Sequence, residues 1–229
     1  RNQLILNLAR RDVQDYLIES LDALLRDHNI AFIKWDMNRN VSEPGWPDAP
    51  REARELWVRY VEGVYRVWGT LRERHPRVIW QSCSGGGGRA DVGILRHADQ
   101  IWVSDNTIAT SRLGIQEGFS QLFPASVMES WVTDGAWSFG HSVTPLSLAY
   151  RFHVSMCGVL GVGLNLFTMD EAEKQEARHW IEVYKRIRPI VQFGTQHRLA
   201  APASGYAAVQ YLDHEQRAGV LFAFRMFKP

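Results

Sequence analysis

Residues 30–38, IAFIKWDMN, join an apolar run directly to a cluster of polar groups. Phe32 is typical of a strand that is buried in a core, whereas Lys34, Asp36 and Asn38 follow at alternating positions. A strand that ends in this way either enters a surface turn or delivers polar side chains to a reaction centre. The remainder of the chain decides between these two interpretations.

The stretch belongs to a regular alternation of apolar runs and helical patterns. Strands are predicted over residues 3–7, 30–36, 78–83, 100–104, 127–134 and 158–166. Helices are predicted over residues 13–25, 56–71, 91–98, 113–123 and 171–192, with one more between 134 and 158. The result is six strand–helix units in strict alternation.

Nearly continuous apolar strands that alternate with helices are typical of a parallel sheet buried on both faces. An open doubly wound sheet and an incomplete (β/α)₈ barrel both fit this pattern. A barrel uses all its strand ends to build one site, whereas an open sheet concentrates ligand contacts near one switch point. Polar groups end several successive strands here, at Asp36, Ser82–Ser84, Asp105–Asn106, Asp134 and Asn165. We therefore predict an α/β fold of the (β/α)₈ TIM-barrel type.

The predicted barrel is incomplete at its N-terminus, because six units are visible and a barrel needs eight. The missing units are expected to precede Arg1. Residues 206–212 and 220–224 are predicted strands around a charged turn, and they indicate the start of a small antiparallel β-domain. The predicted domains are residues 1–193 for the partial barrel and residues 194–229 for the β-domain.

Composition narrows the class of partner. The net charge of +1 gives no electrostatic footprint for nucleic acid or an anionic membrane, so neither is expected as a partner. No apolar run approaches the roughly 20 residues that span a bilayer. Two cysteines exclude a disulfide framework and C-x-x-C metal spacing, and together with the lack of a visible export signal they favour the cytoplasm. Nine tryptophans are many; core packing can account for most of them, and flat aromatic faces also lean mildly towards a sugar ligand.

Asp36 and Asp105 are the leading candidates for catalysis. Both end predicted strands, and a closed barrel would place them across one face of the molecule. Paired carboxylates that face each other perform glycoside hydrolysis, but strand-end aspartates also cap helices, form turns, bind metals or act as bases. Asp91 is expected to open a helix and Asp99 to lie in a turn, while the role of Asp134 stays open.

Residues 82–89, SCSGGGGR, form the second unusual feature. Four glycines after a strand permit a backbone course that a Cβ atom would block. The run lacks the lysine and hydroxyl of a P-loop and the spacing of G-x-G-x-x-G, so a close approach to a neutral ligand is the preferred interpretation. A flexible loop is the alternative, with Cys83 as a small buried hydrophobe.

Three motifs in this order and spacing, FIKWDMNR, WQSCSGGGGRAD and WVSDNT, resemble glycoside hydrolase family 36, the bacterial-type α-galactosidases. The resemblance runs from about residue 1 to 192 and is strongest between residues 30 and 120. It implies a (β/α)₈ barrel that follows a large β-domain and precedes a smaller one. This chain would then contain the later part of the barrel and the start of the C-terminal domain.

The resemblance also implies roles for individual residues. Asp36 matches the nucleophile and Asp105 the general acid/base of the family. The matching substrate-binding positions are Arg1, Lys34 and Asn38 on the sugar and Cys83 and Gly86 near its 2-hydroxyl. The chain departs from the family pattern at Ile108, over residues 128–140 and at 163–165. These differences leave the outer subsites and the exact substrate open, but they do not affect the two aspartates.

The implied reaction is the release of terminal α-linked galactose from oligosaccharides such as raffinose or melibiose with retention of configuration. Lys34 lies on the same strand face as Asp36, and its charge should lower the pKa of that carboxyl. No metal and no organic cofactor are needed. The alternatives are an α-N-acetylgalactosaminidase, α-galactosyl transfer, or a non-catalytic sugar-binding remnant. By analogy with the family, a homo-oligomer is expected.

Overall fold

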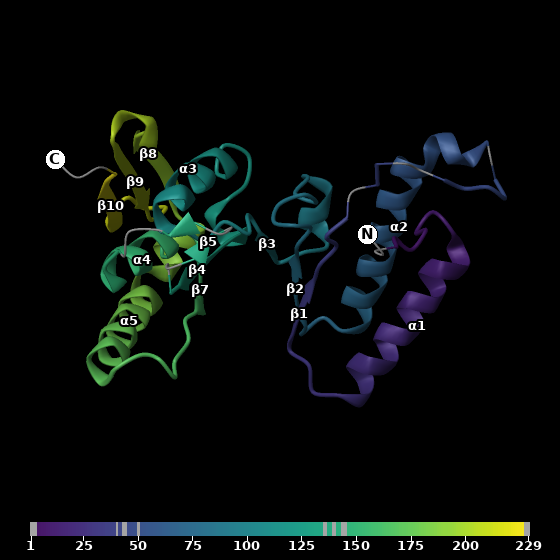
Figure 1. The fold of residues 1–229 in the computed structure, drawn as a ribbon, viewed down its shortest axis with the longest axis horizontal. Coiled ribbons are helices and arrows are strands. Elements are labelled where there is room, and N and C mark those ends of the chain that lie inside the picture. Colours follow the sequence, from purple (N-terminus) through teal and green to yellow (C-terminus); the bar gives the residue numbers. More distant parts are fainter. Residues whose placement is uncertain are drawn as a thin grey trace. The chain divides into compact units, whose positions relative to one another are not determined.

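The structure, a computed structural model, describes residues 4–39, 41–42, 45–49, 51–134, 137–138, 141–142 and 146–226. The chain divides into two units, Arg1–Asp99 and Gln100–Pro229, which we name unit 1 and unit 2 (Figure 1). Among the described residues, no helix combines the length and the apolar character that a bilayer crossing requires.

Unit 1 combines two helices with a parallel strand pair. Its elements are α1 (Arg11–Asp27), β1 (Phe32–Trp35), η1 (Glu52–Glu55), α2 (Leu56–Arg74), β2 (Ile79–Ser82) and η2 (Gly93–Arg96). The helices α1 and α2 run side by side (Figure 1). The strands pair in parallel, with Lys34 opposite Gln81 and Trp35 opposite Ser82. The carboxyl ends of β1 and β2 therefore meet at one edge, where Asp36 follows β1.

Helix α2 packs on these strands through one apolar face. The buried residues of α2 recur at helical spacing: Leu56, Tyr60, Gly63, Val64, Val67, Trp68 and Leu71. The Trp68 ring is fully buried, with its centroid 5.5 Å from that of Trp35 and 6.2 Å from that of Trp80. Such aromatic contacts add about 0.5–1.5 kcal/mol each to area burial, so they fix α2 against β1 and β2.

Unit 2 contains three parallel strands and an antiparallel sheet. Its first elements are β3 (Gln100–Trp102), α3 (Ala109–Phe119), η3 (Ala125–Val127), β4 (Met128–Thr133), β5 (Trp137–Ser138), β6 (His141–Ser142), α4 (Leu148–Ser155), β7 (Val159–Gly163) and α5 (Glu171–Phe193). Then follow β8 (Thr195–Ala200), η4 (Pro202–Ser204), β9 (Tyr206–Leu212) and β10 (Gly219–Arg225). β4 pairs in parallel with β3 and β7, and β9 lies between β8 and β10 in antiparallel register.

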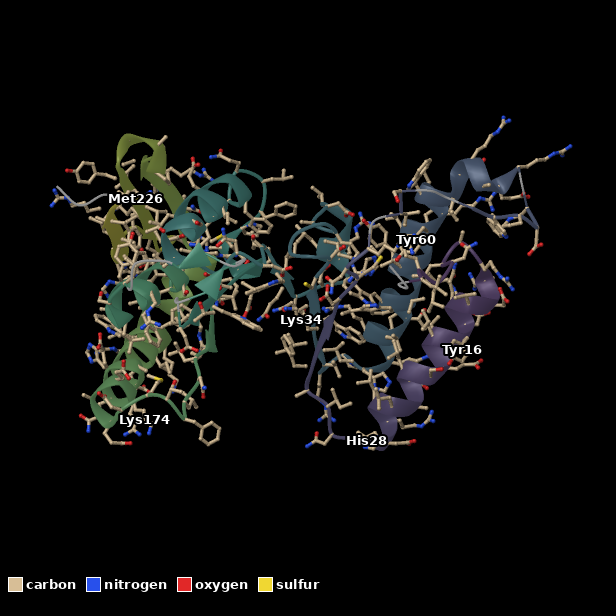
Figure 2. All side chains as sticks on the ribbon, viewed as in Figure 1. Tyr16, His28, Lys34, Tyr60, Lys174 and Met226 are labelled. Carbon is tan, nitrogen blue, oxygen red and sulfur yellow. The ribbon has the colours of Figure 1, made fainter. Side chains whose placement is uncertain are left out.

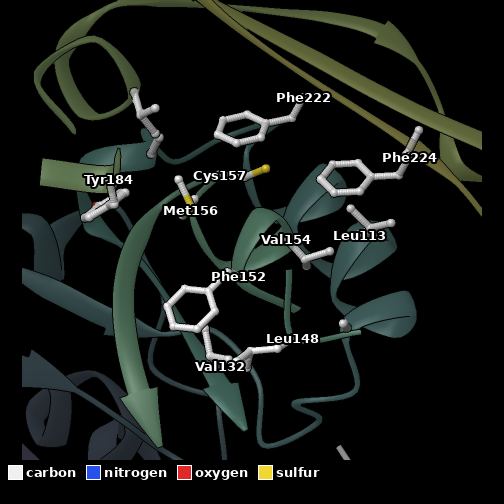
Figure 3. Close-up of a cluster of buried hydrophobic side chains, with 14 of the residues drawn as sticks. Leu113, Val132, Leu148, Phe152, Val154, Met156, Cys157, Tyr184, Phe222 and Phe224 are labelled. Atoms are coloured by element: carbon white, nitrogen blue, oxygen red, sulfur yellow. The ribbon is translucent and has the colours of Figure 1, made fainter. Parts of the chain in front are cut away.

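The core of unit 2 joins the antiparallel sheet to the helices (Figure 3). Phe152 and Met156 contribute from α4 and its C-cap, and Phe222 and Phe224 from β10. The Tyr211 hydroxyl of β9 donates a hydrogen bond to the Cys157 carbonyl at 2.7 Å, which satisfies a buried polar group inside this core. The two sheets therefore share one hydrophobic core within unit 2.

Several predicted elements are confirmed. Helix α5 extends over 171–193 against a prediction of 171–192, and its start is fixed by a capping box. In that box the Glu173 amide donates to Asp170 Oδ1 at 2.8 Å, and the Asp170 amide donates to Glu173 Oε2 at 3.1 Å. The predicted strands at 30–36, 78–83, 100–104, 127–134 and 158–166 all occur, with shorter bounds.

Other elements differ from the prediction. Residues 4–7 form no strand in the described part of the chain, because no described strand pairs with them. Strand β8 was missed, since TQHRLA is polar and mostly exposed and becomes a strand only through its pairing with β9. Helix α3 begins at Ala109, four residues before the predicted start. The prediction missed this first turn because residues 109–112 carry no apolar periodicity.

Candidate active site

In unit 1, Asp36 lies directly after β1 and receives several hydrogen bonds. The Asn38 side-chain amide donates to Asp36 Oδ2 at 3.0 Å, and the Cys83 thiol donates to the same carboxylate. The backbone N–H groups of Gly85 and Met37 also favour its charged form, while their own hydrogen bonds go to Asn38 Oδ1 at 3.0 Å and to the Cys83 carbonyl at 3.2 Å. A carboxylate with several donors is held in one orientation and is favoured in its charged form.

These hydrogen bonds set the protonation of Asp36. Partial burial acts to raise its pKa, but the donors from Cys83, Asn38 and the backbone outweigh burial, so the pKa lies below the ordinary value of 3.8. Asp36 is therefore ionised at neutral pH, as a nucleophile must be. The direction agrees with the prediction, although the main cause is hydrogen bonding and not the charge of Lys34.

Cys83 is a buried thiol that stays protonated. Burial raises its pKa to about 11; the Gly86 amide and the Lys34 charge act against this shift, while the Asp36 carboxylate reinforces it. At neutral pH the thiol therefore keeps its proton and can donate a hydrogen bond to the Asp36 carboxylate. Cys83 is thus more than a small buried hydrophobe, because it takes part in the polar cluster around the carboxylate.

The glycine loop is folded tightly onto the segment after β1. Gly85 and Gly86 have φ angles of 54° and 93°, in the region that favours glycine. The Gly85 amide donates to Asn38 Oδ1 at 3.0 Å, and the Ser84 hydroxyl donates to the Met37 carbonyl at 2.8 Å. The loop therefore orients Asn38, which in turn orients Asp36, and its hydrogen bonds argue against the flexible-loop interpretation.

Neighbouring elements complete the cluster. Figure 2 labels Lys34 on β1 and Tyr60 on α2. Lys34 is half-buried, and the Tyr60 hydroxyl donates to Met37 Sδ at 2.9 Å. The structure brings together the predicted residues Lys34, Asp36, Asn38, Cys83 and Gly86 in unit 1. Arg1, the remaining predicted sugar contact, lies outside the described residues.

In unit 2, Asp105 lies three residues after β3 and is exposed. The Trp102 indole nitrogen donates to Asp105 Oδ1 at 2.7 Å. The Trp102 ring packs on the Trp131 ring with centroids 4.6 Å apart, and the Trp131 indole donates to Glu129 Oε1 at 2.7 Å. Asp105 is thus held beside an aromatic pair whose Trp102 ring is buried.

Three of these residues were missed as site candidates. The sequence pattern places Trp102, Glu129 and Trp131 only within apolar strands. Glu129 and Trp131 alternate along β4, which places both on one face, and a buried acid on an apolar strand is the signal that could have found them.

Asp134 and Asp91 have structural contacts. Asp134 accepts the Asn165 amide at 3.3 and 3.4 Å and so connects the ends of β4 and β7. Asp91 accepts a hydrogen bond from the Ile94 amide at 2.8 Å at the start of η2, a short 3₁₀ helix where a longer helix over residues 91–98 was predicted. Among the described residues, no group of three or more His, Cys, Asp or Glu side chains is placed to hold a metal ion.

The chain has relatives among known proteins. A family model described as melibiase matches residues 1–194. The α-galactosidase AgaA of Geobacillus stearothermophilus is 42% identical over 226 residues, which cover 98% of this chain and 31% of AgaA. The α-galactosidase 2 of Hypocrea jecorina is 37% identical over 228 residues, which cover 99% of this chain and 29% of that protein.

Solved structures give the same result. The crystal structure of AgaA matches with a TM-score of 0.92 at 40% identity and covers 98% of this chain and 31% of that chain. Crystal structures of two AgaA variants, each with one aspartate replaced, are complexes with raffinose and with stachyose. Both match with a TM-score of 0.92 at 39% identity, over 98% of this chain and 31% of theirs.

The structural matches define an incomplete (β/α)₈ barrel followed by a small antiparallel sheet, and they confirm the predicted fold class. The chain belongs to the melibiase family, the α-galactosidases of glycoside hydrolase family 36, so the resemblance read from its motifs is confirmed. It spans about a third of the length of the curated relatives it matches.

Proposed function

We propose that this chain carries the two catalytic aspartates of a retaining α-galactosidase, with Asp36 as the nucleophile and Asp105 as the general acid/base. The observation that carries this proposal is the setting of Asp36 at the end of β1. There the Cys83 thiol, the Asn38 amide and backbone N–H groups keep an aligned carboxylate ionised.

The reaction follows from these roles in two steps. In the first step, an Asp36 oxygen attacks the anomeric carbon while Asp105 gives its proton to the departing glycosidic oxygen, which leaves a β-galactosyl ester on Asp36. In the second step, Asp105 removes a proton from water, and the resulting oxygen attacks the same carbon and releases α-galactose. Two inversions give net retention, and Asp36 and Asp105 return to their starting states.

The neighbouring residues would bind the sugar. Lys34 and Asn38 present donors for galactose hydroxyls, and the loop at Cys83 and Gly86 lies close to the carboxylate that attacks, as a contact to the 2-hydroxyl requires. The low pKa of Asp36 and the protonated Cys83 thiol fit this arrangement, because the thiol can donate to the carboxylate and then to the sugar. No metal and no organic cofactor takes part in these steps.

The relatives support the choice of substrate and of aspartates. AgaA variants bind raffinose and stachyose, both of which end in α-linked galactose. The aspartates replaced in those two variants lie 70 positions apart in AgaA, and Asp36 and Asp105 lie 69 positions apart here. This near-equal spacing is expected if the same pair of residues is concerned.

The test uses the full-length protein with raffinose. Proton NMR in the first seconds of hydrolysis should show α-galactose before mutarotation, and a crystal structure should place the carboxyl groups of Asp36 and Asp105 about 5–5.5 Å apart. Initial formation of β-galactose, or a separation of about 6.5–9.5 Å, would indicate an inverting enzyme and contradict the roles of Asp36 and Asp105. A parallel assay with an α-N-acetylgalactosaminide tests the alternative substrate. The cytoplasmic location and the homo-oligomer stay predictions.

A further inference from the structure

We infer that Arg89 and Arg112 are positioning residues for the two aspartates, each holding the backbone carbonyl directly before its aspartate. This role goes beyond the proposed function and depends on it, because positioning matters for catalysis only if Asp36 and Asp105 react. Neither arginine is assigned a contact with the sugar.

Arg89 closes the glycine loop in unit 1 and turns back onto the strand ends. Its Nη2 donates to the Trp35 carbonyl at 2.5 Å and to the Cys83 carbonyl at 2.8 Å. Trp35 precedes Asp36, and Cys83 supplies the thiol that donates to it. The guanidinium carbon lies 5.4 Å from the centroid of the buried Trp68 ring, within the range of a cation–π contact.

Arg112, on helix α3, makes the corresponding carbonyl contacts in unit 2. Its side chain is almost fully buried, with 1% of its surface exposed. Its Nη2 donates to the Glu129 carbonyl at 2.7 Å, and its Nη1 lies 3.4 Å from the carbonyl of Ser104, the residue before Asp105. The guanidinium carbon is 5.8 Å from the centroid of the Trp102 ring, whose indole N–H donates to Asp105.

The two contacts therefore follow one scheme. In each, a guanidinium bridges the carbonyl before an aspartate and a carbonyl of a neighbouring strand or strand end, and it packs on a tryptophan. Burial lowers the pKa of both arginines, to about 10 for Arg112, which shows that the surroundings cost the cations solvation. A buried cation without a partner destabilises the fold, and so does a buried backbone carbonyl without a partner. Each arginine therefore stabilises the structure most when it keeps its contacts with these carbonyls.

Geometry explains why arginine is required. A planar guanidinium offers several N–H groups in fixed directions and can serve two carbonyls at once, whereas a lysine ammonium is a point charge on a flexible stem. An arginine-to-lysine substitution therefore keeps the positive charge, but the lysine no longer holds the two bridged carbonyls at a fixed separation. A displacement of about 1 Å at a reacting group can cost about 100-fold in rate.

Arg151 supplies a matched control. Its Nη1 donates to the Thr133 carbonyl at 2.5 Å, directly before Asp134, so it repeats the contact at an aspartate with no assigned catalytic role. The corresponding lysine substitution removes the same kind of carbonyl contact without touching Asp36 or Asp105. A purely structural role for the arginines predicts similar effects at all three positions.

The experiment compares Arg89→Lys, Arg112→Lys and Arg151→Lys in the full-length protein. With raffinose, the first two variants should lose about 100-fold in kcat with KM within about threefold, and Arg151→Lys should keep kcat within about threefold. An aryl galactoside with a good leaving group distinguishes the positioning of the nucleophile by Arg89 from the positioning of the acid/base by Arg112. Arg112→Lys should retain the initial burst of aryl release, because that step needs little protonation, whereas Arg89→Lys should lose it.

The outcomes are decisive in either direction. If Arg89→Lys and Arg112→Lys keep kcat within threefold, or lose no more than Arg151→Lys at equal thermal stability, the positioning role is wrong. If a lysine variant does not fold, the matching Arg→Gln variant is measured by the same two readouts, since its neutral amide removes the buried charge. Full activity of Asp36→Asn would overturn the proposed function itself, whereas an inactive Asp36→Asn beside a fully active Arg89→Lys would overturn only the positioning role.

Discussion

Asp36 and Asp105 both follow parallel strands, but their surroundings differ. Asp36 receives hydrogen bonds from a thiol and a side-chain amide, and these donors together with nearby backbone N–H groups lower its pKa. Asp105 receives the indole N–H of Trp102 beside an aromatic pair. Similar backbone positions thus differ in their side-chain surroundings: one carboxyl is fixed in its charged form by several donors, while the other accepts the indole N–H of a buried tryptophan.

The greatest loss of activity should come from replacing the residue in the richer hydrogen-bond environment. Asp36→Asn keeps the shape of the side chain but removes the nucleophile, so kcat should fall by more than about 10⁴-fold on raffinose and on activated aryl galactosides alike. Mass spectrometry should show no galactosyl-enzyme. If this variant still accumulated a galactosylated protein, the roles of Asp36 and Asp105 would have to be exchanged.

Asp105→Ala should give a smaller and substrate-dependent effect. Loss of a general acid costs about 10²–10⁴-fold with raffinose, whereas galactosylation by an aryl galactoside with a good leaving group should be nearly unaffected. Stopped-flow measurement of aryl release should then show a burst followed by slow turnover. Equal losses on both substrates would remove the distinction between the two aspartates.

Cys83→Ala tests the source of the low pKa at Asp36. The thiol stabilises the charged carboxylate, so its removal should raise the pKa of Asp36. Since Asp36 acts only when ionised, the acid limb of the pH profile of kcat/KM should move to higher pH. At neutral pH Asp36 stays ionised, and the loss of the proposed thiol contact with the sugar should lower activity by roughly 10-fold. Cys157→Ala, at the other buried cysteine, is the matched control and should leave the acid limb in place. An unmoved limb in both variants would show that the thiol does not tune Asp36.

The mildest effect concerns the glycine loop. Gly86→Ala places a Cβ atom at a φ of 93°, so it should destabilise the fold by about 1 kcal/mol or more and disturb the Cys83 donor. Gly114→Ala is the control, because it lies exposed in helix α3 with nothing within 4 Å of the added atom. That substitution should be neutral or stabilising by up to about 1 kcal/mol in thermal unfolding. Equal destabilisation by both would mean that the loop conformation carries no special strain.

The strand alternation predicted most of this arrangement. Lys34, Asp36 and Asn38 were found because they alternate at the end of an apolar strand, and Cys83 and Gly86 because four glycines follow another strand. The carbonyl contacts of Arg89 and Arg112 could not be predicted, since a backbone acceptor has no residue type that a sequence pattern could show. Strand β8 was not predicted for a related reason, because its pairing with β9, and not its composition, makes it a strand.

Trapping the covalent intermediate is the decisive test of the role of Asp36. The full-length protein would be incubated with a fluorinated galactosyl fluoride that is turned over slowly, then digested and mapped by mass spectrometry. The assignment predicts one fluorinated galactosyl residue, attached through an ester to Asp36. A label on Asp105, or complete turnover to the fluorinated β-galactose without any ester, would contradict it.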